Sequence, residues 1–253
     1  MQKNCKIGFV IQARLTSTRF PNKMIRPFYN DQNILELLIN RFKENFPEIR
    51  LIVATSSLSA NDPIEKICKQ LEVICFRGSE DDVLSRFVSV GVEHGFDYIM
   101  RICGDNPFIH VESIQRLLND FDEEDYLSFK TKEGKPVIKT HYGFWTEIVS
   151  LSALKRIQSL KINPFYHEHV TNYIYENSND FNIKLISIDD VFDEKKYIRL
   201  TVDTPKDFEI AGKIYQNVVK QDGGFIFNEL FSCIDNNKEY IKIMTTEIEN
   251  NGK

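Results

Sequence analysis

Short apolar runs rich in β-branched residues recur along this chain and alternate with segments that repeat apolar residues at helical spacing. Such runs are typical of parallel strands buried on both faces, and parallel strands need helical crossover connections. The predicted strands are 7–11, 51–55, 72–77, 98–102 and 184–188. The predicted helices are 34–46, 63–71, 83–94, 151–160, 166–176 and 205–218. The alternation predicts an α/β fold with a mostly parallel central sheet flanked by helices.

The middle of the chain is less regular. Segments 126–130 and 136–140 flank the turn-like sequence Lys-Glu-Gly-Lys, which predicts a β-hairpin arm near 126–145. The polar end, 246–253, is expected to fray into a flexible tail. A chain of 253 residues with 42% hydrophobic content can bury one large core, so we expect a single domain over 1–245.

Charge and composition restrict the possible partners. The chain has 32 basic and 37 acidic side chains, a net charge of −5, which disfavours nucleic acid and anionic membranes as partners. Residues 1–50 nevertheless hold nine basic side chains against four acidic ones. No apolar run approaches the roughly 20 residues of a membrane span. The five cysteines are odd in number and include no C-x-x-C pair, so reduced thiols and a cytoplasmic location are expected.

A basic loop follows the first predicted strand, at the carboxyl edge where α/β sheets bind ligands. Residues 11–23 read Ile-Gln-Ala-Arg-Leu-Thr-Ser-Thr-Arg-Phe-Pro-Asn-Lys. Arg14 and Arg19 can bind a polyphosphate as two-pronged donors, and Lys23 can act as a mobile point charge. The spacing matches neither a Walker loop nor a dinucleotide fingerprint. From spacing alone, an ordinary surface loop fits equally well.

Two aspartates are candidates for a metal site. Asp105 follows the strand 98–102, where Gly104 would let the backbone approach a ligand. Asp203 lies between a predicted strand end and the helix that starts near Pro205. Carboxylate oxygens are the ligands that Mg²⁺ prefers. On the residues alone, a turn residue at Asp105 and a helix cap at Asp203 are simpler interpretations.

Five collinear motifs resemble those of cytidylyltransferases that activate acidic sugars. The likeness is strongest to the spore-coat polysaccharide type, which is similar to the CMP-sialic acid and CMP-deoxyoctulosonate synthetases. The motifs span 11–23, 77–87, 101–107, 168–171 and 201–205. The resemblance implies a Rossmann-like nucleotide-diphospho-sugar transferase fold, Mg²⁺ as cofactor, and transfer of CMP from CTP with release of pyrophosphate.

The resemblance also implies roles for individual residues. Asp105 and Asp203 would hold the metal and, with Arg14 and Lys23, form the catalytic set. The residues expected to contact the nucleotide are Ala13, Arg14, Ser17, Arg19, Lys23, Arg77, Ser79, Asp82 and Arg101. For Asp82, helix capping is the alternative, and Arg101 is expected to bind phosphate or to pair with a carboxylate.

The acceptor side is expected to involve His141, Trp145, Glu147, Glu168 and His169. The family commonly shows Gly-Leu-Asp-x-Glu where residues 143–147 read Gly-Phe-Trp-Thr-Glu, so an indole stands where an Asp is usual. Trp145 would fit a core position as well. A zinc site at His167 and His169 is disfavoured, because residues two apart point to different sides of a helix.

The leading expectation is an enzyme that binds CTP and a small acidic acceptor, either an acidic sugar or a phosphate monoester, in surface polysaccharide or capsule biosynthesis. A homodimer formed through the hairpin arm is expected, as in related cytidylyltransferases. Two alternatives stay open. A glycosyltransferase of similar fold would need an Asp-x-Asp pair, which the run Gly-Asp-Asn at 104–106 lacks. A nucleotide-binding protein without catalytic activity is the other.

Overall fold

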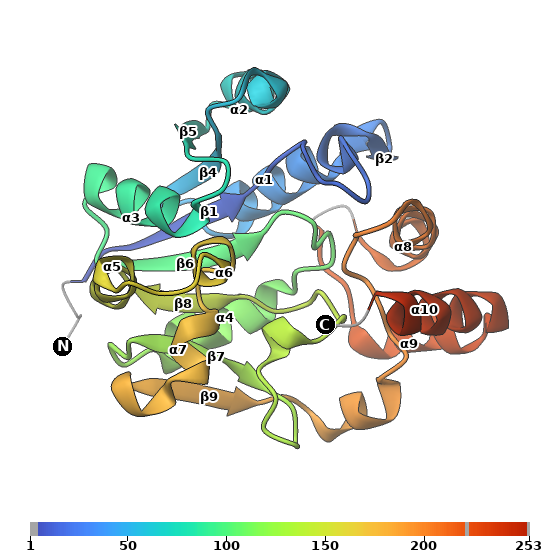
Figure 1. The fold of residues 1–253 in the computed structure, drawn as a ribbon. Helices are drawn as coiled ribbons and strands as arrows, with labels where there is room; N and C mark the ends of the chain where they lie inside the picture. The colour runs from blue at the N-terminus through green and yellow to red at the C-terminus, as the bar shows by residue number, and fades with distance from the viewer. Residues whose placement is uncertain (1–4, 221–222, 252–253) are drawn as a thin grey trace.

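A seven-stranded sheet forms the centre of the computed structural model, which describes residues 5–220 and 223–251 (Figure 1). The strand order is β5-β4-β1-β6-β8-β7-β9. In chain order the strands are β1 (Ile7–Gln12), β4 (Leu51–Ser56), β5 (Ile74–Gly78), β6 (Tyr98–Cys103), β7 (Tyr126–Lys130), β8 (Glu147–Ser150) and β9 (Ile183–Ser187). The longer helices are α1 (Ile34–Asn45), α2 (Asp62–Gln70), α3 (Val83–His94), α4 (Val111–Asp120), α5 (Leu151–Ser159), α8 (Pro205–Val218), α9 (Phe227–Asp235) and α10 (Lys238–Asn250). Among these residues, no helix has the length and apolar character that a membrane crossing requires.

The sheet is mostly parallel, which confirms the predicted fold class. β1 pairs in parallel with β4 and β6, and β4 pairs in parallel with β5. β8 alone runs the other way, because it pairs antiparallel with both β6 and β7, while β7 and β9 are parallel. The carboxyl ends of the other six strands therefore share an edge with the start of β8. The C-terminal helices α8, α9 and α10 gather beside this edge (Figure 1).

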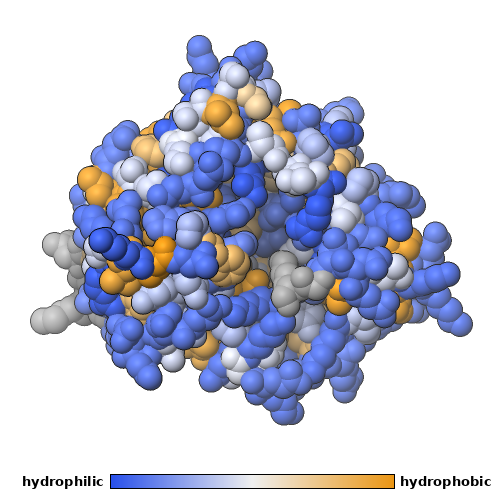
Figure 2. Space-filling view, in the orientation of Figure 1, coloured by the Kyte–Doolittle hydropathy of each residue, from blue (hydrophilic) through white to orange (hydrophobic). Residues whose placement is uncertain are grey.

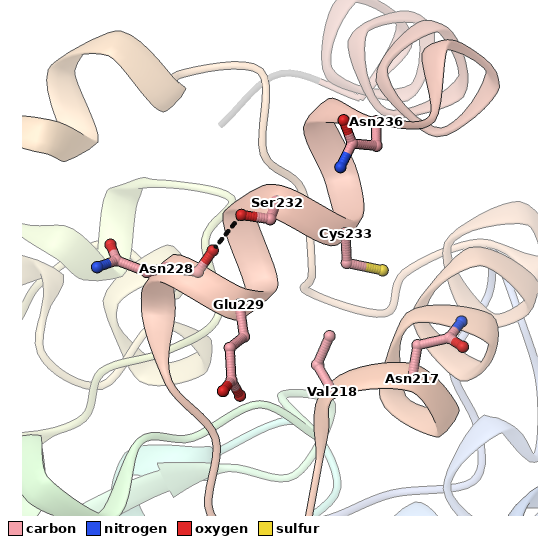
Figure 3. A pocket seen from close by; sticks show the side chains of 7 residues that line it. All are labelled: Asn217, Val218, Asn228, Glu229, Ser232, Cys233 and Asn236. Carbon is pink, nitrogen blue, oxygen red and sulfur yellow. Dashed lines mark hydrogen bonds between the residues drawn. The ribbon is translucent and has the colours of Figure 1, made fainter.

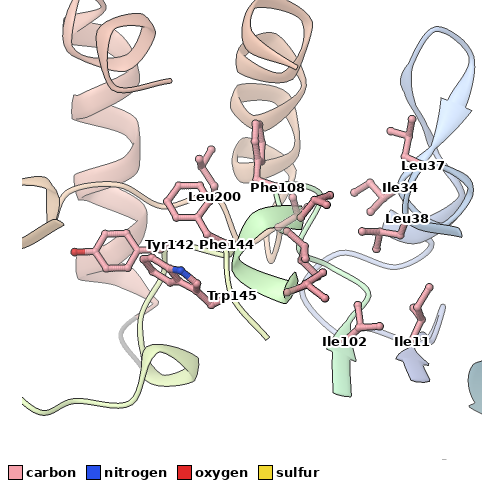
Figure 4. Packing of buried hydrophobic residues seen from close by; sticks show 14 of the residues in the cluster. Ile11, Ile34, Leu37, Leu38, Ile102, Phe108, Tyr142, Phe144, Trp145 and Leu200 are labelled. Atoms are coloured by element: carbon pink, nitrogen blue, oxygen red, sulfur yellow. The ribbon is translucent and has the colours of Figure 1, made fainter. Parts of the chain in front are cut away.

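The core has two parts, one on each face of the sheet, because successive side chains of a buried strand point to opposite faces. Phe9 and Ile11 of β1 pack with residues of α1 and α4, whereas Val10 packs with residues of α3 and α5. Figure 4 shows Ile11 and Ile102 facing Ile34 and the other α1 side chains, with an aromatic group around Trp145 farther along. This packing stabilises the β1 and β6 ends that carry the candidate site.

The predicted hairpin arm differs in the structure. Segment 126–130 is the sheet strand β7, and one antiparallel bridge, Lys130 to Pro136, stands where a second strand was expected. Residues Val137–Lys139 form a 3-10 turn. Pro136 cannot donate a ladder hydrogen bond, which disfavours a second strand. Farther along the chain, Tyr142 and Trp145 are buried in the core instead of extending an exposed arm. A two-stranded hairpin does occur, at β2 (Pro27–Tyr29) and β3 (Gln32–Asn33).

The prediction of a frayed tail from 246 is wrong as far as Asn250, where helix α10 ends; residues 252–253 lie outside the described part. Glu247 is buried and accepts a hydrogen bond from the Thr204 hydroxyl at 2.9 Å. Its contact with Thr204, at the start of α8, holds the helix, and no local sequence signal announces it. The predicted helix 166–176 is two short helices, α6 (Phe165–Glu168) and α7 (Asn172–Glu176).

A buried ion pair links β6 to β8. Arg101 and Glu147 are opposite each other in the ladder, and Arg101 Nε donates to Glu147 Oε1 at 2.5 Å. Thr171 donates to the same oxygen at 2.8 Å, and the Tyr126 hydroxyl donates to Oε2. Burial and the Glu147 carboxylate raise the pKa of Tyr126, which keeps its hydroxyl a donor. Glu147 therefore joins β6, β7, β8 and the segment before α7.

We expect Glu147→Ala to destabilise the protein by about 3–5 kcal/mol, because it leaves the Arg101 guanidinium buried without its counter-ion. The double variant Arg101→Met/Glu147→Leu removes both charges and should recover most of this loss. Urea unfolding followed by circular dichroism measures both. A Glu147→Ala protein with wild-type stability and reduced turnover would instead indicate that Glu147 contacts the acceptor.

Candidate active site

The basic loop lies over the carboxyl edge of the sheet, where β1 ends at Gln12. Its conformation is anchored by Asn61, which is fully buried and accepts a hydrogen bond from the Leu15 amide at 2.8 Å. The Thr16 hydroxyl donates to Glu80, so the loop is tied to the second predicted nucleotide motif. These anchors come from segments far away in the sequence, and the basic pattern of the loop gives no sign of them.

Gly104 brings the ends of β1 and β6 together. Its amide donates to the Gln12 carbonyl at 3.0 Å. A Cβ at this position would lie 2.6 Å from that oxygen and 2.8 Å from Met24 Cε, so a side chain would push the strand ends apart. The glycine thus accommodates the neighbouring strand β1, a function that the sequence did not reveal. The contact of Gly104 with Gln12 fixes the backbone position from which the Asp105 side chain extends.

Asp105 and Asp203 converge on one ammonium group. Lys23 Nζ lies 2.9 Å from Asp105 Oδ2 and 3.7 Å from Asp203 Oδ1, and it donates to the Val202 carbonyl at 2.5 Å. Lys23 is only 6% exposed. It was expected to be a mobile charge for phosphates, but here it is held between the two carboxylates. The Val202 amide also donates to the Asp105 carbonyl at 2.9 Å, which joins the two segments.

Arg199 fixes the other side of Asp203. Its Nη2 lies 3.1 Å from Asp203 Oδ2, and its Nε and Nη2 donate to the two oxygens of Asp207 at 2.7 and 2.9 Å. Its Nη1 lies 2.6 Å from His141 Nδ1, and His141 is not among the residues that line the cavity described below. Arg199 and Asp207 were not predicted. Two features of the sequence could have identified them. Arg199 lies between the apolar residues Ile198 and Leu200, and Asp207 follows Thr204 by three residues, the spacing of a capping box.

The helix-cap interpretation of Asp203 is wrong. Thr204 is the N-cap of α8, and it forms a capping box with Asp207. Asp207 also accepts a hydrogen bond from the Asp203 amide at 3.0 Å. The side chain of Asp203 is consequently available to the cations at the sheet edge, as its contacts with Arg19, Lys23 and Arg199 show.

Each of the three loop cations is paired with a carboxylate. Arg14 lies 3.1 Å from Glu168, Arg19 lies 3.0 Å from Asp203, and Lys23 contacts both aspartates. The Arg14 and Arg19 side chains are partly exposed, and such pairs contribute only about 0–1 kcal/mol. A polyphosphate can therefore replace the carboxylates around these arginines at little cost. The surface seen in Figure 2 is mostly hydrophilic and hollowed near its centre.

The second predicted nucleotide motif is partly occupied by structural contacts. Arg77 pairs with Asp62 at 2.7 Å and with Glu65 at 2.6 Å, so its guanidinium is directed to α2. Asp82 caps α3 by accepting a hydrogen bond from the Ser85 amide at 2.8 Å. This is the helix-capping function that the sequence left open as an alternative to a nucleotide contact. The Ser79 hydroxyl oxygen accepts from the Asp82 amide at 3.0 Å. The Ala13 side chain is buried in the core, and Ser17 makes no side-chain hydrogen bond within the described residues.

A small cavity borders Asp105. Its lining residues are Cys103, Asp105, Asn106, Val137, Ile138, Thr140, Gly143, Trp145 and Thr201. Trp145 is 7% exposed and packs edge-on against Phe192, with ring centroids 4.8 Å apart. It is therefore both a core residue and a cavity wall. Because β8 is antiparallel, the residues before it lie at the carboxyl edge of its neighbours.

Two buried polar atoms in this cavity wall lack a hydrogen-bond partner within the described residues: Asn106 Oδ1 and Thr201 Oγ1. Buried polar groups are normally satisfied, so these atoms indicate a place for a polar ligand or a water. Neither residue was assigned to the acceptor from the sequence. Asn106 stood in the Gly-Asp-Asn-Pro motif, and Thr201 opened the motif of Asp203.

The other predicted acceptor residues lie elsewhere. Both oxygens of Glu147 are engaged by Arg101, Thr171 and Tyr126, and the residue is 1% exposed, so burial in the sheet rules out an acceptor contact. Glu168 pairs with Arg14, and His169 packs on Phe165 with ring centroids 4.4 Å apart. Neither lines the cavity. Arg101 pairs with a carboxylate, the second of its two predicted alternatives.

A larger, open pocket lies between α8 and α9 (Figure 3). It is lined by Asn217, Val218, Asn228, Glu229, Ser232, Cys233 and Asn236. This lining includes no cation and no residue of the basic loop. Its one charged side chain, Glu229, would repel a phosphate group, so we place the candidate active site at the sheet edge around Asp105 and Asp203.

Comparison with known proteins identifies the family of this chain. Residues 9–228 match the family described as Cytidylyltransferase. The chain is 37% identical over 210 residues to an uncharacterized protein of Methanocaldococcus jannaschii, covering 81% of each. It is 33% identical over 218 residues to the spore coat polysaccharide biosynthesis protein SpsF of Bacillus subtilis, covering 83% of this chain and 86% of that protein.

A solved structure of a cytidylyltransferase has the same fold as this chain. The cytidylyltransferase of Leptospira borgpetersenii serovar Hardjo-bovis has a TM-score of 0.79 and 28% sequence identity to this chain. The match covers 94% of this chain and 97% of the other. Because the family match spans most of the chain and includes the basic loop, Asp105 and Asp203, this protein belongs to the cytidylyltransferase family.

Proposed function

We propose that the protein transfers CMP from CTP to a small acidic acceptor, with release of pyrophosphate, in surface polysaccharide or capsule biosynthesis. The observation that carries this proposal is the convergence of Asp105 and Asp203 on Lys23 beneath a loop with two further cations. The relation to a spore coat polysaccharide protein supports the biosynthetic setting. We further propose a cytoplasmic homodimer, which light scattering and cell fractionation test.

The triphosphate would be held by the loop. Arg14 and Arg19 would exchange Glu168 and Asp203 for phosphate oxygens, which accept charge-assisted hydrogen bonds from a guanidinium. Charge builds on the β- and γ-phosphates as pyrophosphate leaves, and preorganised cations stabilise it. Lys23 would keep its charge at the centre of the site.

Asp105 and Asp203 fit the Mg²⁺ that the family resemblance implies. Asp105 follows strand β6, and Asp203 lies in the segment before helix α8, where the structure has no strand although the sequence predicted a strand end. Their carboxylates approach the same ammonium, so two hard oxygen ligands are already side by side. The described residues include no group of three or more His, Cys, Asp or Glu that would make a complete metal cage. Mg²⁺ typically needs only one or two carboxylates together with substrate phosphates. When bound, it supplies neutralisation of charge at the α-phosphate.

The acceptor would bind in the cavity next to Asp105. A sugar offers hydroxyl groups to Asn106 Oδ1 and Thr201 Oγ1, and an apolar ring face to Trp145. The attacking oxygen of the acceptor would then lie beside the Asp105 carboxylate. We assign no general base, because a phosphate acceptor needs none and a sugar hydroxyl can lose its proton to a nearby carboxylate or a bound water.

Incubation with CTP, Mg²⁺ and a panel of acceptors tests the proposal directly. We expect pyrophosphate release that depends on an acidic sugar, such as a nonulosonic acid or deoxy-octulosonic acid, with formation of the CMP-sugar. A panel of phosphate esters tests the other acceptor class. Release of CMP or CDP from a preformed nucleotide-sugar would support a glycosyltransferase, and CTP binding without turnover across both panels would support a binding protein.

The variant Asp105→Asn should lower kcat by about 100-fold or more, because it removes one of the two charged oxygen ligands proposed for Mg²⁺. Asp120→Asn is a matched control, since Asp120 is an exposed residue of α4 that pairs with Arg116. Pyrophosphate release measures both, and circular dichroism checks the fold. Full activity of Asp105→Asn would contradict the metal assignment.

Chelation provides an independent test of the cofactor. We expect EDTA to abolish pyrophosphate release and added Mg²⁺ to restore it. Mg²⁺ and CTP together should raise the thermal midpoint more than either alone, because a ligand stabilises only the state that it binds. Turnover that persists after exhaustive chelation would exclude a role for the divalent ion.

A further inference from the structure

Arg86 is a buried cation whose donors are only partly used. It lies in α3, is 1% exposed, and donates from Nη1 to the Ser79 carbonyl at 2.9 Å. Its Nε and Nη2 are buried and have no hydrogen-bond partner among residues 5–220 and 223–251. Buried donors are almost always satisfied, and an unsatisfied charged donor is especially costly. The arrangement indicates that a ligand completes it.

The two free donors form a recognition edge. Nε–H and one N–H of Nη2 lie on the same side of a planar guanidinium and point in parallel, so they suit two adjacent acceptor atoms. The Nη1 bond to Ser79 orients the group. Arginine uses such a fork to read two adjacent acceptors of a nucleobase, as in its contact with guanine.

Arg86 lies where the two nucleotide motifs meet. A Cβ on Gly78 would lie 3.2 Å from Arg86 Cγ, so the absence of a side chain there leaves room for the arginine stem. Burial lowers the pKa of Arg86, the carboxylates of Glu80 and Asp82 raise it, and the charge of Arg14 lowers it. Glu80 also accepts from Thr16 of the basic loop. The edge is thus positioned for the nucleotide, not for a remote ligand.

The surrounding charges favour a neutral ligand atom over a phosphate. Glu80 and Asp82 already compensate the charge of Arg86 and would repel a phosphate group. The phosphates have other cations, Arg14, Arg19 and Lys23, in the basic loop. The nucleobase of a nucleoside triphosphate offers adjacent uncharged acceptors, and unlike the ribose hydroxyls these ring acceptors carry no hydrogen.

We propose that the Nε–Nη2 edge of Arg86 binds O2 and N3 of the cytosine ring and thereby selects CTP over UTP. Cytosine has two adjacent acceptors there, whereas uracil carries a hydrogen on N3 and would set a donor against a donor. The inference rests on the proposed function and adds to it the residue that determines nucleobase specificity.

Access to this edge involves helix α6. This helix packs on α3, and His167 Nδ1 lies 3.0 Å from Asp82 Oδ2. Asp82 and Arg86 are four residues apart and so share one face of the chain at the start of α3. For a base to reach Arg86, α6 would have to move, and the His167–Asp82 and Arg14–Glu168 pairs would open. Both are partly exposed and weak, and their opening frees Arg14 for phosphate.

Calorimetric titration of the wild-type protein with CTP, UTP and 3-deaza-CTP in the presence of Mg²⁺ tests the proposal without any substitution. 3-Deaza-CTP replaces the N3 acceptor with C–H and keeps the rest of the ring. We expect CTP to bind about ten- to one-hundred-fold more tightly than either analogue, the range of one buried unsatisfied donor. Equal affinity for CTP and 3-deaza-CTP would overturn the assignment, while CMP transfer from CTP would stand.

The variant Arg86→Lys keeps the charge and removes the fork. CTP should then bind about as weakly as UTP does, while the affinity for UTP changes little. Arg116→Lys, at an exposed position of α4, is the matched control and should keep the wild-type preference. An equal loss for CTP and UTP would show that Arg86 binds phosphate and would overturn the proposal. Wild-type protein that binds none of the triphosphates would overturn the proposed function as well.

Discussion

Two carboxylates of like charge, Asp105 and Asp203, lie together at the carboxyl edge of the sheet, and the site depends on what neutralises them. Lys23 lies between them, Arg19 contacts one oxygen of Asp203, and Arg199 contacts the other. Without these cations, repulsion between the two carboxylates would tend to separate the two segments. The cations therefore make possible a site with two charged oxygen ligands, and the basic loop has a structural function as well as a proposed binding function.

This charge balance explains how one loop can serve both purposes. In the structure described, the carboxylates occupy the positions where phosphate oxygens would be expected around Arg14 and Arg19. Nucleotide binding then becomes an exchange of partners rather than the creation of new charge contacts. The exchange costs little at the exposed arginines, whereas the buried Lys23 and Arg199 keep their places. In the proposed binding mode, the partners of the exposed arginines would change and the buried ion pairs would stay in place.

The direction of β8, the single antiparallel strand of the seven-stranded sheet, decides which residues of its motif lie at the proposed site. Its start lies beside the ends of its neighbours, which brings Trp145 to the cavity next to Asp105. Two residues later, Glu147 is already inside the sheet and pairs with Arg101. Neighbouring positions of one motif thus have different functions, because a step of two residues moves a side chain about 6–7 Å along the strand.

The sequence by itself determined the strand–helix alternation, the loop at the end of β1, and the motifs that carry Asp105 and Asp203, because these depend on local periodicity and spacing. It also allowed the capping function of Asp82 as an alternative. Only the tertiary structure decided that Thr204 caps α8, that Glu147 is buried, that Lys23 is held between two carboxylates, and that Arg86 keeps two donors unpaired. The burial of Glu147 and the position of Lys23 depend on groups that are tens to more than a hundred residues away in the sequence. The cap of α8 and the unpaired donors of Arg86 depend on which of several nearby groups make hydrogen bonds in the folded chain. A local pattern specifies which groups are present, and the packed fold decides their partners.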